Sequence, residues 1–275
     1  MDAINSIGSR QIRLLGDESI KKQQAGYSEM TYGLFYDENK GVNGQIDEAV
    51  FQGQEGDCWL ISGILSLSYD DKGQELIKDA ISKNPDGSYN VYFKGVDKSY
   101  TITENELNSF NKDTLSNGMG LSNSKYSTGD DDMLLIELAM EKLVAEGDIP
   151  VETLEGITGG SAYYLYELFT DKMTGYAYGD DPDEMANLLN YYNKYQDDCS
   201  ATLGVSDGFA SLDDDHAYAV KSMDNTGLTL VNPWDTTEEV KVSTKELVEN
   251  FGNFDFSLVD NELVEQTSWL EDNYA

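Results

Sequence analysis

Side chains suited to nucleophilic acyl transfer occur at four places in the sequence: Gln52, Cys58, His216 and Asn232. Cys58 begins the apolar run of residues 58–67, which predicts a buried helix, and Asp57 is placed to serve as its N-cap. In the first turn of a helix the dipole and the unpaired amides favour an anion. We therefore expect a lowered pKa for the Cys58 thiol. Gln52 lies six residues earlier, where its amide could donate a hydrogen bond to an oxyanion on an attacked carbonyl.

A thiol nucleophile needs a base, and the chain has a single histidine, His216. His216 begins one predicted strand, and Asn232 ends the next. A tight turn near residues 225–227 would place the two side chains next to each other. An Asn232 oxygen accepting from the imidazole Nδ1–H would fix the tautomer and direct Nε2 outward. Cysteine, base and orienting amide together make the triad used in acyl transfer.

Each of these residues also has a structural interpretation when it is taken singly. A lone cysteine at a helix start is usually a small packing residue, and a lone histidine on a strand is usually a satisfied structural one. Asn232-Pro233 can mark a turn, and Trp234 can be a core residue. The combination of order, spacing and flanking residues favours the catalytic interpretation.

Composition limits the classes of partner. The 275 residues include 18 Lys and Arg against 52 Asp and Glu, so the formal net charge is −34. Such an acidic chain is a poor binder of nucleic acid or of anionic membranes. The acidic excess fits high salt tolerance, cation binding or basic substrates, and composition does not choose among them. The two cysteines and one histidine exclude a disulfide framework and a His-rich metal site. With no membrane span and no secretory signal visible, we expect a soluble monomer, cytoplasmic by default, with export left open.

Hydrophobic periodicity predicts an α+β protein. Helices are expected over 73–82 and 133–147, through Leu165 and Leu168, and from Asp181-Pro182 onward, and a β-hairpin is expected over 89–102. Residues 112–130 are rich in Gly, Ser and Asn and predict a surface loop. Short strands follow from about residue 198. Helices therefore gather with the cysteine, and strands gather with the histidine.

The blocks around Cys58, His216 and Asn232-Pro233-Trp234 resemble the three signature blocks of the calpain family of cysteine proteases. The resemblance covers roughly residues 31–260 and implies a minimal protease core with a papain-like fold. It implies an N-terminal extension (1–30), a helical subdomain with Cys58 (31–158), a β-rich subdomain with His216 and Asn232 (159–262), and a C-terminal tail (263–275). The active-site cleft would lie between the two subdomains.

The same resemblance assigns roles outside the triad. Gln52 and the Cys58 amide would form the oxyanion hole, Gly159 and Gly160 would hold substrate, and Trp234 would shield the His–Asn contact. The chain departs from the family in having Asp213-Asp214-Asp215 directly before His216, where nearby carboxylates would raise the imidazole pKa.

Calpain cores are activated by calcium, so the resemblance suggests Ca²⁺ as an activator, although the chemistry itself needs no cofactor. Glu238 falls where an acidic ligand is expected, and residues 47–48 are a looser candidate. The acidic loops at 130–132, 180–183 and 213–215 offer oxygen ligands of the kind calcium prefers. Helix capping and solvated surface are the alternative interpretations of these loops.

The sequence therefore predicts a calpain-like thiol endopeptidase acting on protein or peptide substrates. Two alternatives stay open. One is a catalytically silent calpain-like binding module, which an unreactive Cys58 would favour. The other is acyl transfer to an amine, as in transglutaminase-like enzymes, but these usually orient histidine with an aspartate, whereas Asn232 favours hydrolysis.

Overall fold

The computed structural model describes residues 41–46, 49–116, 124–147, 153, 155–170, 174–179 and 181–261. Helices and strands both contribute substantially to these residues, so the predicted α+β class is confirmed at this level. The predicted N-terminal extension (1–30) and C-terminal tail (263–275) lie outside the described residues.

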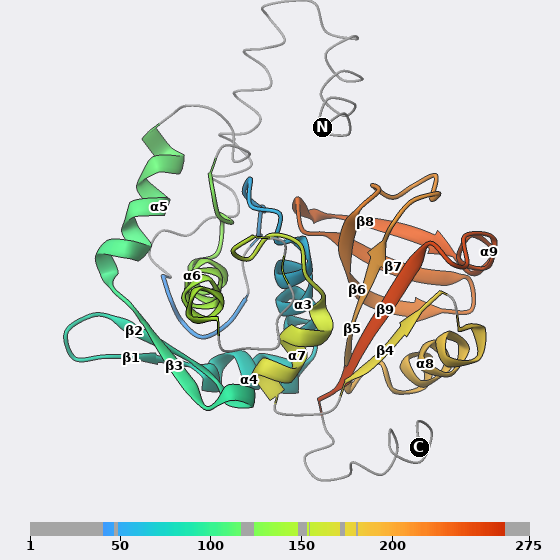
Figure 1. Cartoon of the computed structure of the whole chain (residues 1–275), viewed down its shortest axis with the longest axis horizontal. Coiled ribbons are helices and arrows are strands. Elements are labelled where there is room, and N and C mark those ends of the chain that lie inside the picture. The colour runs from blue at the N-terminus through green and yellow to red at the C-terminus, as the bar shows by residue number, and fades with distance from the viewer. Residues whose placement is uncertain are drawn as a thin grey trace, which may run out of the picture.

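The first part of the chain, here called the helical region, combines helices with a three-stranded antiparallel sheet of order β1-β2-β3, which lies at the outer edge of the region (Figure 1). Its elements are α3 (Cys58–Ser68), α4 (Asp71–Ala80), β1 (Ile81–Lys83), β2 (Tyr89–Phe93), η1 (Lys94–Val96), β3 (Lys98–Ile102), α5 (Glu104–Ser116), α6 (Asp131–Glu146) and α7 (Ala162–Thr170).

The second half, here called the sheet region, is built on a six-stranded antiparallel sheet of order β4-β9-β5-β6-β7-β8. Its elements are β4 (Gly175–Tyr178), α8 (Pro182–Tyr195), β5 (Cys199–Val205), β6 (His216–Asp224), β7 (Gly227–Asn232), β8 (Asp235–Ser243), α9 (Thr244–Glu249) and β9 (Phe254–Asp260). α8 packs on one face of this sheet and α3 on the other (Figure 1).

Several predicted elements form for the expected local reasons. Asp130 caps α6 by accepting from the amides of Asp132 and Met133, and Gly147 ends that helix with a φ of 72°. Asp181 caps α8, with proline at its start. The hairpin predicted over 89–102 is confirmed as β2 and β3, with η1 between them. The helix predicted over 73–82 is α4, which ends at Ala80 because the chain becomes extended there to form β1.

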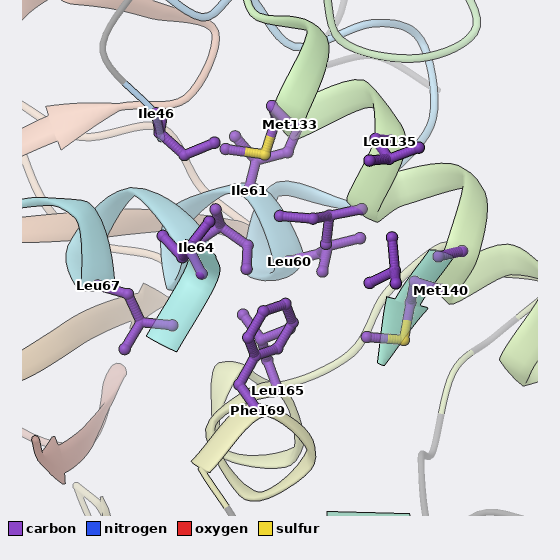
Figure 2. Close-up of a cluster of buried hydrophobic side chains, with 14 of the residues drawn as sticks. Ile46, Leu60, Ile61, Ile64, Leu67, Met133, Leu135, Met140, Leu165 and Phe169 are labelled. Carbon is purple, nitrogen blue, oxygen red and sulfur yellow. The ribbon is translucent and has the colours of Figure 1, made fainter. Parts of the chain in front are cut away.

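Two hydrophobic cores hold the elements together. In the first, α3 lies between α6 and α7, and Figure 2 shows its Ile61 next to Met133 of α6 and its Leu60 facing Leu165 and Phe169 of α7. The sheet contributes to this core as well, through Ala217, Ala219, Val231 and Val259. The second core lies on the opposite face of the sheet and includes Met185, Leu188 and Tyr192 of α8. α3 is thus fixed between the other helices of its region and the six-stranded sheet, with Cys58 at one end.

No helix in the described part of the chain is long and apolar enough to cross a lipid bilayer.

Candidate active site

The N-terminus of α3 lies against the start of β6. The amide of Ala217 donates a hydrogen bond toward the Cys58 thiol, and the Ser62 hydroxyl donates to the Ala217 carbonyl oxygen at 2.9 Å. These two bonds tie the first turns of α3 to one residue of the strand. Since Ala217 follows His216, the structure brings the cysteine to the residue next to the histidine, although they are 158 positions apart (216 − 58).

His216 and Asn232 are brought together by the β6–β7 hairpin. Its strands are antiparallel and joined by a tight turn at residues 225–226, as predicted. The distance from His216 Nε2 to Asn232 Oδ1 is 2.9 Å, so the expected pairing of the two side chains is confirmed. The prediction that Asn232 would bind Nδ1 is wrong, because the bond is made by Nε2.

The orientation of the Asn232 amide follows from its other partners. Its Oδ1 also accepts from the Trp234 amide at 2.9 Å, and its Nδ2 donates to Asp213 Oδ2 at 3.5 Å. An amide oxygen can only accept, so His216 Nε2 must carry a hydrogen. In the neutral imidazole Nδ1 is then the basic nitrogen.

Aromatic rings enclose the imidazole. The Trp234 ring lies on it with centroids 4.2 Å apart, and the Tyr218 ring meets it edge-on at 5.0 Å. His216 is therefore only 5% exposed. This burial lowers the pKa of His216, against the opposing effects of the Asn232 hydrogen bond and the Asp213 charge. The expectation that the acidic loop would raise the imidazole pKa is wrong, since desolvation outweighs the one carboxylate that acts on the ring.

Burial also decides the state of the cysteine. It raises the pKa of the Cys58 thiol to about 11. Hydrogen bonds from the amides of Ala217, Trp59 and Cys58 lower it by less. The predicted lowering of the thiol pKa at the helix N-terminus is therefore wrong, because desolvation exceeds what the amides provide. Near neutral pH the site holds a thiol and a neutral imidazole.

Gln52 lies where the loop before α3 meets the turn after β7. Its backbone amide donates to the Pro233 carbonyl at 2.9 Å, which joins the Cys58 loop to the Asn232-Pro233-Trp234 turn. Its side-chain Nε2 donates to the Glu55 carbonyl at 2.9 Å and to Asp57 Oδ1 at 3.1 Å. Both side-chain N–H groups are thus engaged within the loop. Gln52 can donate to an oxyanion only if one of these bonds opens.

A buried pair of carboxyl groups lies behind the cysteine, and the sequence interpretation missed it. Asp57 occupies the N-cap position of α3, but its side chain makes no capping bond and instead shares a hydrogen bond with Glu137 of α6. Both residues are 0% exposed.

Burial, followed by the charge of Glu137, raises the pKa of Asp57 well above its usual value. Burial also raises the pKa of Glu137, although Asp57 and Ser127 donate hydrogen bonds to it. Asp57 is therefore the member that keeps its proton.

The sequence does contain a signal for this pair. Glu137 is the only charged residue in the apolar run from Met133 to Met140, and a charge inside a fully buried helix must find a partner.

Gly159 and Gly160 lie beside the first turn of α3. The Gly159 amide donates to the Gly56 carbonyl at 2.7 Å, and a Cβ on Gly160 would come within 2.6 Å of the Trp59 ring. The Trp59 indole nitrogen in turn donates to the Ile157 carbonyl at 2.9 Å. Only a glycine at position 160 lets this segment pass so close to the residue after Cys58.

The acidic residues suggested as calcium ligands have varied surroundings. Asp130 and Asp181 cap helices, in line with the alternative interpretation, and Asp213 accepts from Tyr218 and Asn232. The Glu238 side chain, residues 47–48 and Asp180 lie outside the described part of the structure. Within the described part, no three His, Cys, Asp or Glu side chains are grouped as a metal ion would need.

The assembled site combines a partly buried thiol, a histidine whose neighbour Ala217 meets that thiol and whose tautomer is fixed by an amide, and an aromatic cover. A scan of the chain against models of known protein families finds no match, and a search of curated proteins finds no significant relative.

Proposed function

We propose that this protein is a calpain-like cysteine endopeptidase with a papain-like arrangement of its two regions. The observation that supports this most directly is the His216 Nε2–Asn232 Oδ1 bond, in a strand that starts where the Cys58 thiol lies. That bond leaves Nδ1 as the nitrogen able to take a proton. The thiol comes from a helix of one core and the imidazole from the sheet, so a substrate would bind across their junction.

In this proposal the site works by general-base catalysis from a neutral pair. His216 Nδ1 takes the thiol proton as Cys58 Sγ bonds to the peptide carbonyl carbon. The resulting imidazolium gives that proton to the leaving amine as the C–N bond breaks. Water then attacks the thioester, again with His216 as base, and releases the acid and the free thiol. Asn232 holds the ring in one orientation through both steps.

Charge develops on the carbonyl oxygen during each attack. The amide of Cys58, at the first turn of α3, is suited to donate to this oxyanion. Gln52 Nε2 would be the second donor after leaving Glu55 or Asp57. Substrate binding would thus have to supply the free energy for that exchange.

Binding without catalysis is the second candidate function, and specific observations favour it. The raised thiol pKa, the engaged Gln52 amide and the Trp234 ring over His216 all describe a site at rest. A silent calpain-like module would keep this arrangement in the presence of substrate.

Digestion of a denatured protein separates the two functions. Wild type, Cys58→Ala and Cys199→Ala should be compared by peptide mapping, each in calcium and in a chelator. Cys199 is the matched control, because it is buried and lies near the other end of α3, where it lines a pocket of about 330 Å³ with Ser66 and Tyr69. We expect cleavage by wild type and Cys199→Ala and none by Cys58→Ala. Equal fragment patterns for wild type and Cys58→Ala would refute the peptidase.

The comparison of digests in calcium and in chelator tests whether Ca²⁺ is an activator. Cleavage that stops in chelator and returns with Ca²⁺ would support calcium regulation, and cleavage that is unchanged would remove it. Adding a primary amine to the digest also tests transamidation, which would yield amine-tagged products in place of free carboxyl ends.

A further inference from the structure

An acidic side chain lies on the same face of the sheet as the candidate nucleophile. In the six-stranded sheet Gly204 of β5 pairs with Ala217 of β6 on one side and with Asp255 of β9 on the other. Residues paired across antiparallel strands project to the same face. Ala217 is the residue whose amide meets the Cys58 thiol. Asp255 therefore belongs to the row of residues that faces α3 and the thiol.

The alternation along β9 leads to the same face. Val259 is four residues after Asp255 and packs in the core that contains α3. Side chains two and four residues apart on a strand share one face. Figure 1 shows β9 between β4 and β5, on the side of the sheet that α7 approaches.

The carboxylate of Asp255 occupies the space that a side chain at position 204 would fill. A Cβ built on Gly204 would lie 2.3 Å from Asp255 Oδ2 and 2.9 Å from Oδ1. The carboxylate thus leans across β5 toward Ala217, and neighbouring strands are only about 4.8 Å apart. The glycine at 204 is what leaves room for the Asp255 carboxylate over β5, the strand that pairs with β6.

This carboxylate has no partner among the described residues. None of them donates a hydrogen bond to it, and no lysine or arginine there pairs with it. Burial alone raises its pKa to about 6. Asp255 is half-buried, so a cation can reach its carboxylate, and a partly desolvated carboxylate without a partner is suited to bind one.

Tyrosines flank the carboxylate. Tyr178 pairs with Asp255 across β4 and β9, and Tyr176 lies on the same face. Burial, followed by the charge of Asp255, raises the pKa of the Tyr176 phenol. The rings of Tyr176 and Tyr178 meet edge-on at 5.0 Å, and Tyr163 of α7 packs on Tyr176 at 5.7 Å. Aromatic faces next to a carboxylate attract the ammonium of lysine or the guanidinium of arginine.

We propose that Asp255, with Tyr176 and Tyr178, binds a lysine or arginine side chain of the substrate close to the bond that is cleaved. Asp255 is then a specificity-determining residue, and this assignment rests on the proposed peptidase function. Gly204 contributes by leaving the carboxylate free to lean toward Ala217. The chain has 52 acidic residues against 18 basic ones, and its negative charge would attract such substrates from solution.

Fluorogenic peptides with one randomised position at a time test this assignment. Wild type should cleave peptides with Lys or Arg at one fixed position at least tenfold better, by kcat/KM, than the norleucine equivalents. Asp255→Asn should lose that preference, so that its kcat/KM for the Lys or Arg peptides falls to that for their norleucine equivalents. Gly204→Ala should weaken it as well, because the new methyl group displaces the carboxylate without removing it. Asp79→Asn, a change of the same charge at an exposed position of α4, should behave as wild type.

The outcomes distinguish this assignment from the peptidase function. Cleavage that depends on Cys58 but shows the same profile in wild type and Asp255→Asn overturns the role of Asp255 and leaves the peptidase standing. No Cys58-dependent cleavage of any peptide overturns both. Circular dichroism of each variant shows whether it is folded, and Gly204→Ala supplies a second test that keeps the carboxyl group.

Discussion

The indole of Trp234 lies over the imidazole of His216, with ring centroids 4.2 Å apart and ring planes inclined by 34°. Trp234 is 42% exposed while His216 is 5% exposed, so the tryptophan separates the histidine from solvent. The Trp234 amide also donates to the Asn232 oxygen that holds His216. One residue thus covers the base and secures the amide that orients it.

Replacing Trp234 by alanine should raise the pKa of His216 toward its ordinary value, because the lost ring exposes the imidazole and removes much of the desolvation that lowers it. The chain has one histidine, so a single imidazole signal in an NMR titration reports this pKa without assignment problems. Tyr92→Ala removes an exposed ring from β2, away from the site, and should leave the titration unchanged. An unaltered midpoint in Trp234→Ala would show that Trp234 is not what buries the ring.

The Cys58 thiol should react slowly with iodoacetamide at neutral pH. A thiol with a pKa of about 11 is almost fully protonated at pH 7, and the thiolate is the reactive form. In the Cys199→Ala background, where Cys58 is the one cysteine left, the rate measured by mass spectrometry should rise about tenfold per pH unit from pH 7 to pH 10. Fast labelling that is already constant below pH 7 would instead indicate a thiolate–imidazolium pair.

Local sequence rules accounted for the parts of the structure formed by neighbours in the chain. The His216–Asn232 contact spans 16 residues of one hairpin, so strand alternation and a turn signal sufficed to predict it. The caps at Asp130 and Asp181 are equally local.

Two helices that were not predicted, α5 and α9, carry local signals too. Thr103 and Glu106 form a capping box at α5, and Ser243 caps α9 through the Glu246 amide. Residues 112–116 of the loop predicted over 112–130 therefore belong to α5 instead.

The charge states of the site could not be predicted in this way, because they depend on burial by distant segments. The thiol pKa is set by β6 packing on α3, and Gln52 is held by Glu55 and Asp57, which compete with any oxyanion for its amide. Asp57 and Glu137 lie 80 residues apart (137 − 57), and only the packing of α6 behind α3 brings them together. Helix-end electrostatics gave the wrong direction for the pKa shift of Cys58, because the desolvation of the thiol by distant segments cannot be read from the sequence.

Asn232 should matter through the orientation of His216. Asn232→Ala removes the acceptor of the Nε2 hydrogen bond, which we expect to lower kcat/KM for a cleaved peptide by about tenfold, the equivalent of about 1.4 kcal/mol. Asn232→Asp keeps an acceptor for both Nε2 and the Trp234 amide but adds a negative charge. It should raise the pKa of His216 and move the acid limb of the pH–rate profile to higher pH, because the base must be neutral. A profile that does not move would show that this imidazole is not the base.

The Asp57–Glu137 pair should make the protein less stable as pH rises. Both pKa values are raised in the folded state, so the folded protein binds more protons than the unfolded chain above the ordinary pKa values of about 4. The stability due to the pair is therefore complete below that pH and is lost as pH rises toward the folded pKa values.

Asp57→Asn keeps an acceptor for Gln52 and a donor for Glu137 but cannot ionise. Urea unfolding from pH 5 to pH 8 should show wild type losing stability relative to Asp57→Asn, by up to about 1.4 kcal/mol per pH unit. Asp79→Asn should run parallel to wild type, and a gap between wild type and Asp57→Asn that stays constant with pH would mean that the pair shares no proton.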